Sequence, residues 1–501
     1  MNNTEDENIM FNLSSRLEIN FTALKELFQK DDVVKFRTLN SKDSKIRCGI
    51  VFVDGASDKT IINENVIKPI VNSINDKSLE NFELSSYMEN NVILCDEIKK
   101  TTDVNVIINS IMYGNTALFI DGVFEVLILS TKGNNARDIS APPSENVIRG
   151  SREGFTESIL ENINLIRKRL QDTNLKFELN EIGRRTKTKV CIVYIQDIAQ
   201  DEIIKEVKKR LDSIDTDGIL ESGYIEEFIR DEPLSPFRTI GSTERPDVAA
   251  GKLLEGRVVI ICDGTPFVLS LPYLFIESFQ ASEDYYSNYV FSSINRLLRL
   301  LCFFLSTSTP AIYVALVSYH QEMIPTSLFM SIASSREGVP FPTVFETILM
   351  LVTFEILREA GIRLPQQIGQ AISIVGALVL GEAAVSAKII SAPIVIVVAL
   401  TGISGFGVPS MLVSIIVLRF IFLIASFIFG LYGYIFSIIG IFTYLMSMKS
   451  FGVNYMEYAN IISRENIKDT AIRVPHWLMQ YRPRFITKNK TRMGQRRKGL
   501  H

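Results

Sequence analysis

The chain has 501 residues, of which 47% are hydrophobic, and it carries 53 basic against 56 acidic side chains. This average conceals a division, because residues 297–448 hold only 12 charged side chains whereas the other 349 residues hold 97. So long a charge-poor block excludes a wholly soluble protein, and it is too long for a single membrane anchor.

The first twenty residues are polar and acidic, without the apolar core of a signal peptide. We therefore expect residues 1–290, which precede the apolar block, to stay in the cytoplasm. The five cysteines are odd in number and form no CxxC pair, which favours reduced thiols inside the protein over disulfides or a zinc site. We expect no metal and no cofactor.

The N-terminal half contains an internal repeat with a fixed offset of 142 positions. Residues 50–53 (IVFV) align with 192–195 (IVYI), and residues 119–122 (FIDG) align with 261–264 (ICDG). Short β-branched runs indicate strands, and Asp-Gly between two such runs indicates a hairpin turn in which glycine accepts a positive φ. We therefore predict two similar cytoplasmic α/β subdomains, residues 1–150 and 151–290. The alternative is an accidental match between common hairpin motifs.

A helix is predicted between the two copies, capped by Thr156 and ending near Arg169. Basic side chains gather at its end and in the segment that follows. They are Arg167, Lys168, Arg169, Arg184, Arg185, Lys187 and Lys189. We favour a solvated helix face for this cluster, and a phosphate or anionic-lipid site is the alternative.

Six apolar stretches follow, at residues 297–318, 342–357, 368–387, 392–406, 411–429 and 431–448. A helix needs about 20 apolar residues to span a bilayer, so the second and fourth stretches are short enough to be re-entrant segments. We predict a helical membrane domain at residues 291–450 with four to six passes. Arg296 and Arg299 at the start of the first stretch, and Lys449 after the last stretch, predict that both ends of the domain lie on the cytoplasmic side.

The third stretch has two distinct faces. The first face repeats small residues every four positions, which favours close helix packing; it consists of Gly369, Ser373, Ala377 and Gly381. An acidic side chain within a span is costly unless it faces water or a partner, so in a ring of identical chains the second face would line a pore. That face consists of Val375, Val379, Glu382 and Ser386. The alternative is that Glu382 lies at a helix end and is solvated at the interface.

Three further charges lie in the apolar block, namely Glu346, Glu355 and Arg419. Arg419 is in the middle of its stretch and should not face lipid, so we expect a carboxylate partner, Glu346 or Glu355, or a side chain that reaches the interface. Residues 402–409 (GISGFGVP) break the helical pattern. A tight loop between two spans is favoured there over backbone carbonyls exposed to ions.

Residues 451–501 form a predicted basic cytoplasmic tail, with 11 basic and 2 acidic residues from position 464 onward. Its place beside a membrane block predicts contact with membrane lipids, and no nucleic-acid partner is expected. For the basic residues 482–498, a disordered tail without a specific target is favoured over binding of anionic lipid or a partner.

Catalytic motifs are absent from the sequence. Its three histidines lack metal-ligand spacing, and there is no P-loop, HExxH or GxSxG. We therefore expect no catalytic residues and no enzyme.

Several longer motifs carry a family resemblance. They are TERPD (243–247), EGRVVIICDGTPF (255–267), PFPTVFE (340–346), REAGIRLP (358–365) and GEAAVSAKIISAPIVIVVALTGISGF (381–406). In this order, and over nearly the whole chain, the sequence resembles the A subunit of GerA-type spore germinant receptors. Lys388 departs from the pattern, since a small residue would be expected there, so residue roles are not carried over to that end of the third stretch.

The resemblance implies a protein of the spore inner membrane that acts with a transporter-like B subunit and a lipoprotein C subunit. It also implies a homo-oligomeric ion channel, opened when the B subunit binds germinant. A sporulation-associated paralogue with the same architecture remains an alternative. So do a secondary transporter, although the repeat lies in the soluble half rather than among the spans, and a scaffold whose spans only anchor it.

Overall fold

The computed structural model describes residues 12–43, 46–73, 81–133, 142, 144–145, 147–363, 379, 381–457, 469–470, 472–483, 485–489 and 491–492. The chain divides into two compact units. The sheet unit comprises Met1–Arg230, Ile240–Pro272 and Gln480–Gly494. The helical unit comprises Asp231–Thr239, Tyr273–Met479 and Gln495–His501.

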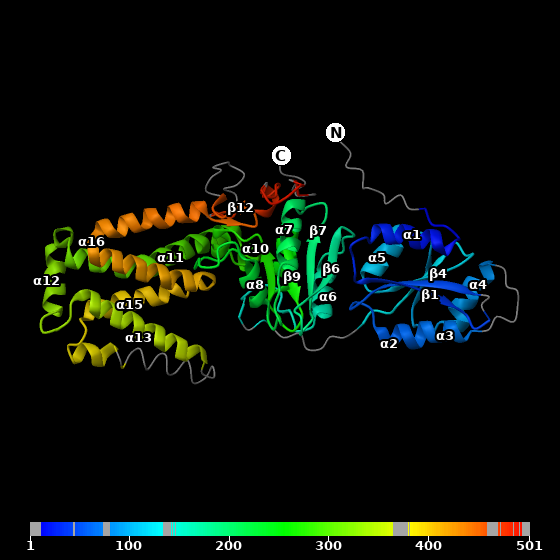
Figure 1. The fold of residues 1–501 in the computed structure, drawn as a ribbon, viewed down its shortest axis with the longest axis horizontal. Helices are drawn as coiled ribbons and strands as arrows, with labels where there is room; N and C mark the ends of the chain where they lie inside the picture. Colours follow the sequence, from blue (N-terminus) through cyan, green and yellow to red (C-terminus); the bar gives the residue numbers. More distant parts are fainter. Residues whose placement is uncertain are drawn as a thin grey trace. The chain divides into compact units, whose positions relative to one another are not determined.

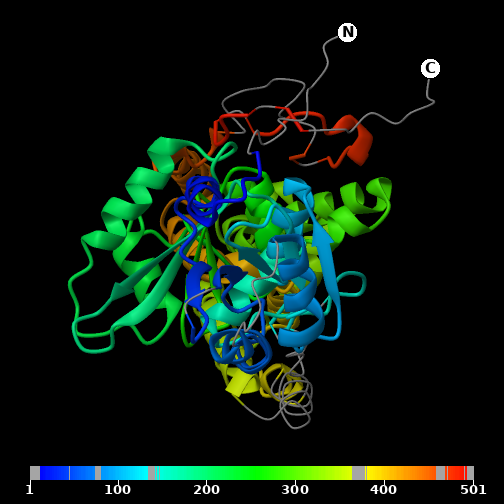
Figure 2. The ribbon, with the colours of Figure 1, turned by 90° about the vertical axis from the view of Figure 1, so that its right-hand side faces the viewer.

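The first repeat of the sheet unit is a five-stranded antiparallel sheet in the order β1-β2-β4-β5-β3. Helices cover both of its faces, as Figures 1 and 2 show. Its elements are α1 (Leu17–Leu27), β1 (Val34–Asn40), β2 (Arg47–Val53), α2 (Lys59–Ile61), η1 (Ile62–Ile67), α3 (Lys68–Asn72), α4 (Asn81–Tyr87), η2 (Met88–Val92), β3 (Ile98–Thr101), α5 (Val104–Met112), β4 (Thr116–Ile120) and β5 (Val126–Leu129).

The second repeat has the same architecture, with the strand order β6-β7-β9-β10-β8. Its elements are α6 (Ile159–Arg169), β6 (Leu175–Ile182), β7 (Thr188–Ile195), α7 (Asp201–Asp212), α8 (Ser222–Ile229), β8 (Gly241–Thr243), α9 (Pro246–Leu254), β9 (Val258–Cys262) and β10 (Val268–Leu271). Helices α6 and α9 begin and end 142 positions after α1 and α5. The predicted pair of similar subdomains is therefore confirmed, and all strand pairs in the two sheets are antiparallel.

The Asp-Gly turn has the same second role in both repeats. Besides turning the hairpin, the carboxylate of Asp121 accepts the backbone N–H of Leu17 at 3.0 Å, and that of Asp263 accepts the N–H of Ile159 at 3.1 Å. Each carboxylate therefore satisfies a donor at the first residue of α1 or α6. Thr156 was predicted to cap α6, but the residue at the N-cap position is Ser158, and the Thr156 hydroxyl donates to Glu161 and accepts the N–H of Ser158.

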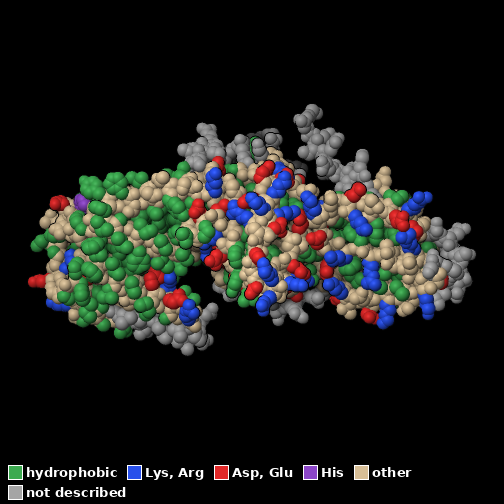
Figure 3. All heavy atoms as spheres, in the orientation of Figure 1, with side chains coloured by type: hydrophobic (Ala, Val, Ile, Leu, Met, Phe, Trp, Pro, Cys, Tyr) green, Lys and Arg blue, Asp and Glu red, His purple; other side chains and the backbone are tan. Residues whose placement is uncertain are grey.

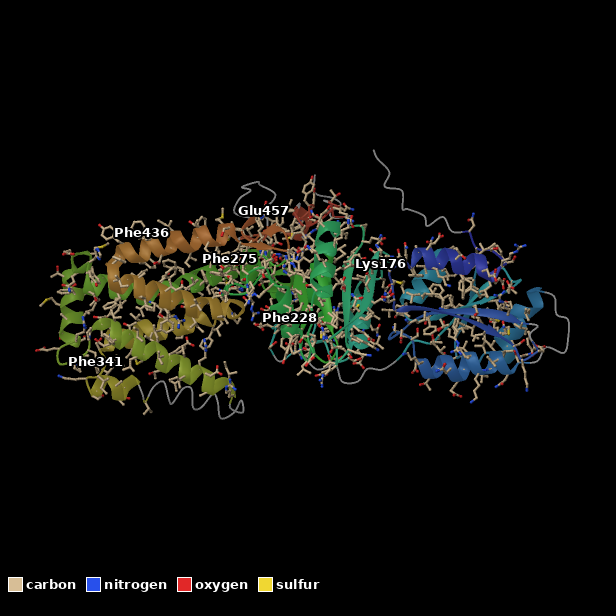
Figure 4. The ribbon with its side chains drawn as sticks, viewed as in Figure 1. Lys176, Phe228, Phe275, Phe341, Phe436 and Glu457 are labelled. Atoms are coloured by element: carbon tan, nitrogen blue, oxygen red, sulfur yellow. The ribbon has the colours of Figure 1, made fainter. Side chains whose placement is uncertain are left out.

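A buried ion pair joins the two repeats. The guanidinium of Arg167 lies 2.7 Å from the carboxylate of Asp31, both side chains are 1% exposed, and the guanidinium also covers the ring of Phe177. Lys176, labelled in Figure 4, donates to the carbonyl of Leu27 across the same junction. The prediction that Arg167 lies on a solvated face was therefore wrong, because the first repeat covers this side of α6.

The cysteines are unpaired, as predicted. Cys48 and Cys191 lie in the central strands β2 and β7 and are fully buried. Burial raises the pKa of the Cys48 thiol to about 12 and that of Cys191 well above its ordinary value. Both thiols are therefore protonated core residues at neutral pH.

The helical unit is built from apolar helices whose outer faces carry hydrophobic side chains, whereas charged groups mix over the sheet unit (Figure 3). Its helices are η3 (Phe275–Phe279), α10 (Glu283–Tyr286), α11 (Tyr289–Ser318), η4 (Gln321–Met323), α12 (Thr326–Ser335), α13 (Thr343–Arg363), α15 (Ala392–Gly405), η5 (Pro409–Met411), α16 (Leu412–Ser447) and η7 (His476–Leu478). A short hairpin, β11 (Lys449–Ser450) and β12 (Val453–Asn454), follows α16.

Two of the described helices are long and apolar enough to cross a membrane, Tyr289–Ser318 and Pro409–Ser447, and α15 is a shorter apolar helix. The second is divided at Gly430, whose φ of 63° and ψ of −143° leave the helical region. The rings of Phe422 and Tyr434 lie 5.6 Å apart, although twelve residues of straight helix would separate them by about 18 Å. The two arms of α16 therefore fold against each other, and they match the fifth and sixth predicted stretches.

Candidate functional site: buried charges of the helical unit

An ion pair lies among the apolar helices of the helical unit. Arg419, on the first arm of α16, is 2% exposed, and its Nη1 donates to Oε1 of Glu355 on α13 at 2.9 Å. Arg358, one turn further along α13, lies 2.6 Å from the other carboxylate oxygen. Of the two carboxylates considered from the sequence, the structure thus places Glu355 beside Arg419.

A proline explains how Arg419 finds a second acceptor. Pro310 lies inside α11 and has no backbone N–H, so the carbonyl of Ser306, four residues earlier, lacks its usual helical donor. Nε of Arg419 donates to that carbonyl at 3.0 Å. The proline in the first apolar stretch was the signal in the sequence that could have located this contact.

Glycines bring the helices around the ion pair close together. A Cβ at Gly402 on α15 would overlap the ring of Phe354 on α13, and one at Gly407 would lie 2.9 Å from the sulfur of Cys302 on α11. The predicted break at residues 402–409 begins too early, because Gly402 and Gly405 still belong to α15, and the connection to α16 runs only from residue 406 to residue 411. Its glycines permit packing that any larger side chain would prevent.

Glu346 forms a second buried polar site at the start of α13. Its side chain is 0% exposed, and Oε2 accepts the backbone N–H of Ser391, the residue that precedes α15, at 2.9 Å. Oε1 lies 3.7 Å from the guanidinium of Arg336. A carboxylate at the beginning of α15 also interacts favourably with the helix dipole, so Glu346 ties α13 to α15.

The third predicted stretch lies mostly outside the described residues, and this includes Gly369, Ser373, Val375 and Ala377. Of the remaining positions, Gly381 is buried, and a Cβ there would lie 3.6 Å from Val395 on α15. The side chains of the second face that the structure describes are exposed: Val379 (54%), Glu382 and Ser386. Among the described residues, Gly381 thus faces α15, whereas the described side chains of the second face are exposed.

A network of charges at the foot of α11 was missed by the sequence analysis. Arg296, 1% exposed, donates to the carboxylates of Asp284 (2.9 Å) and Asp469 (2.8 Å), and Arg299 donates twice to Asp284, at 2.6 and 2.9 Å. Burial raises the pKa of Asp284, but hydrogen bonds and charge from Arg299 and Arg296 outweigh burial, so this pKa lies below its ordinary value. These arginines, used above to orient the membrane block, are thus engaged with carboxylates.

No metal centre is visible in the described part of the chain, since no three His, Cys, Asp or Glu side chains gather there as a metal would require. The cluster at the foot of α11 consists of paired charges and backbone carbonyls. Such charge-assisted hydrogen bonds hold α11 against the segment that begins at Asp469, which is a structural role.

The chain is similar in sequence to several known proteins. Residues 22–485 match the family model of the "Bacillus/Clostridium GerA spore germination protein". The chain is 44% identical over 474 residues to spore germination protein KA of Bacillus subtilis (94% of this chain, 87% of the relative). It is 39% identical over 457 residues to spore germination protein GerLA of Bacillus cereus (90% and 92%).

Two further similarities were found. An uncharacterised membrane protein of Bacillus subtilis, YfkQ, is 41% identical over 500 residues (99% and 96%). Among solved structures, the N-terminal domain of the A subunit of the Bacillus megaterium spore germinant receptor GerK3 is 34% identical, with a TM-score of 0.41, and covers 53% of this chain and 98% of that domain.

Proposed function

The chain belongs to the GerA family of spore germination proteins, and we propose that it is the A subunit of a nutrient germinant receptor whose copies assemble into an ion channel. Its role lies in spore germination, and its relatives are named as germination proteins rather than as enzymes. By the family resemblance, its partners are a transporter-like B subunit and a lipoprotein C subunit in the spore inner membrane.

The observation that carries the channel proposal is the uncovered face next to α15. Glu382 and Val379 are exposed while Gly381, between them, packs toward α15. Within a bilayer, an exposed carboxylate is stabilised only by water or by a polar partner. In a ring of copies with this face turned inward, Glu382 would face a water-filled pore, and Val375 and Val379 would form its constriction.

The C-terminal segment supports an even number of passes. The described residues between 481 and 492 contact the second repeat within the sheet unit, and this supports placing them on the same side of the membrane as the N-terminal repeats. A chain that begins and ends on one side crosses the bilayer an even number of times. We propose that the repeats lie in the cytoplasm, which is the spore core, together with the described part of the C-terminal segment.

The test is ion flux through the purified chain in liposomes. Val379→Ala and Val375→Ala should widen the constriction and raise basal leak, and Glu382→Gln should lower the preference for cations. Ile396→Ala is the matched control, because Ile396 lies on the outside of α15 and is 70% exposed. If both valine variants behave like this control and the chain stays monomeric, the channel proposal is wrong.

A further inference from the structure

In each repeat, a further segment of chain pairs with the loop that follows the second strand, β2 or β7. The two pairing segments come from different parts of the chain. In the first repeat, Ser57 forms an antiparallel bridge with Lys132, and the N–H of Gly133 donates to the carbonyl of Ala56 at 3.1 Å. Residues 132–133 come shortly after β5, so this closing segment belongs to the repeat itself.

In the second repeat, the C-terminal segment makes the same two contacts. Ala199 forms an antiparallel bridge with Thr487, and the N–H of Lys488 donates to the carbonyl of Ile198 at 2.9 Å. Ile198 and Ala199 lie 142 positions after Ala56 and Ser57. The bridge and the hydrogen bond of the first repeat are therefore reproduced by residues more than 200 positions downstream of the second repeat.

The reason is visible in the course of the chain after β10. Residues 274–275, which correspond to 132–133, belong to the helical unit, where Leu274 is fully buried and Phe275 packs near Phe237. In the second repeat, the residues that would close the loop therefore pack in the helical unit instead. Gly256 makes room for the replacement, since a Cβ there would lie 2.5 Å from Cγ2 of Thr487.

Further contacts besides the bridge hold the C-terminal segment on the second repeat. Ile486 is fully buried, and three basic side chains bind the second repeat. Arg482 donates to the carbonyl of Leu254 at 2.8 Å, Lys488 contacts Asp201 at 2.6 Å, and Arg492 contacts Glu255 at 3.0 Å. Lys488 and Arg492, which belong to the predicted basic tail, thus neutralise carboxylates of the sheet unit, and Arg482 satisfies a backbone carbonyl.

The preceding part of the same segment is held in the helical unit. Asp469 and the carbonyl of Thr470 accept from Arg296 at 2.8 and 3.0 Å, and Arg473 donates through its backbone N–H to Ser293 at 3.1 Å. Arg296 and Ser293 both lie on the first turns of α11. One stretch of chain, residues 469–492, is therefore bound at one end to α11 and at the other to the second repeat.

We propose that residues 469–492 are a strap, in which 481–492 fill a strand-docking site on the second repeat and 469–479 grip the foot of α11. The occupant of the docking site is this chain's own C-terminal segment, bound by backbone pairing as in the addition of an edge strand. Because the segment is one continuous stretch of chain, we expect its release from the second repeat to loosen its contacts with α11 as well. This inference does not depend on the channel proposal.

Disulfide trapping in the purified full-length chain tests the docking site. The pair Ala199→Cys/Thr487→Cys should oxidise to an intramolecular disulfide within about three-fold of the rate of Ser57→Cys/Lys132→Cys, the matched pair in the first repeat, because bridged residues lie within disulfide reach. The parent chain, with its own five thiols, gives the background. A rate at least about ten-fold below that of the 57/132 pair shows that the segment is not docked.

Hydrogen exchange in the same chain tests whether docking of the C-terminal segment is coupled to the start of α11. Lys488→Pro removes the N–H that binds Ile198, whereas Lys488→Ala keeps it and removes only the side-chain contacts with Asp201 and the carbonyl of Gln196. The proline variant should exchange at least about ten-fold faster at residues 481–492 and also faster at residues 284–299, and the alanine variant should resemble the parent. Faster exchange confined to residues 481–492 would overturn the strap.

Discussion

The two repeats of the sheet unit share their strand order, their helix boundaries and the turn carboxylate that caps a helix, yet they differ in how they meet the rest of the chain. Residues 89–97 of the first repeat remain in the sheet unit, whereas their counterparts, 231–239, belong to the helical unit. There Phe237 is 1% exposed, while its counterpart in the first repeat is Cys95, which is half-buried. The first repeat thus closes with its own residues, whereas two segments of the second repeat pack in the helical unit instead.

The largest effect is expected from Phe237→Ala. Its ring lies 6.3 Å from that of Phe275 and 6.5 Å from that of Tyr444, so truncation leaves a cavity and should lower the free energy of unfolding by about 3–5 kcal/mol. Cys95→Ala at the matching position should cost less than about 1 kcal/mol. Thermal denaturation of the purified chain measures both variants, and equal losses would contradict the specialisation of the second repeat.

The junction between the repeats should be nearly as sensitive. Asp31→Asn removes the charge that pairs with buried Arg167 and should cost about 3 kcal/mol, because an unpaired guanidinium is left out of water. The double variant Asp31→Leu/Arg167→Met removes both charges and should recover part of this loss. If the double variant is no more stable than Asp31→Asn, the buried charge is not the cause.

A shared feature should respond equally in both copies. Asp121→Ala and Asp263→Ala each remove the carboxylate that accepts the first N–H of a helix, and each should cost about 1–2 kcal/mol. Hydrogen exchange at the starts of α1 and α6 reports each copy separately. Destabilisation in only one repeat would show that the two aspartates are not equivalent, although the backbones match.

The smallest effect is expected from the contact between Asp201 and Lys488, which only the second repeat has. The hydrogen bond from Lys488 lowers the pKa of Asp201 below its ordinary value of 3.8. The stabilisation is therefore present above that pH and lost as pH falls through the lowered pKa. Both groups are partly exposed, so Asp201→Asn should cost less than about 1 kcal/mol near neutral pH and nothing at high salt. Denaturation curves between pH 6 and 3 measure this, and a constant difference would contradict the assignment.

The sequence by itself determined the repeat, the two hairpin turns, the unpaired buried cysteines, the apolar stretches and the family. These depend on local patterns, namely β-branched runs, Asp-Gly pairs and long apolar segments, which the chain carries wherever it folds. The choice of Glu355 over Glu346 as the partner of Arg419 was beyond it, because both carboxylates lie on the same predicted stretch.

Only the tertiary structure decided which charges are buried and what the C-terminal segment binds. Arg167, Arg296 and Lys488 look in sequence like solvated or lipid-facing bases, and each is paired with a carboxylate that the fold brings near. The docking of residues 486–488 joins positions nearly 300 residues apart. No local pattern specifies such a contact, since it arises from a gap that the second repeat leaves when its own chain continues into the helical unit.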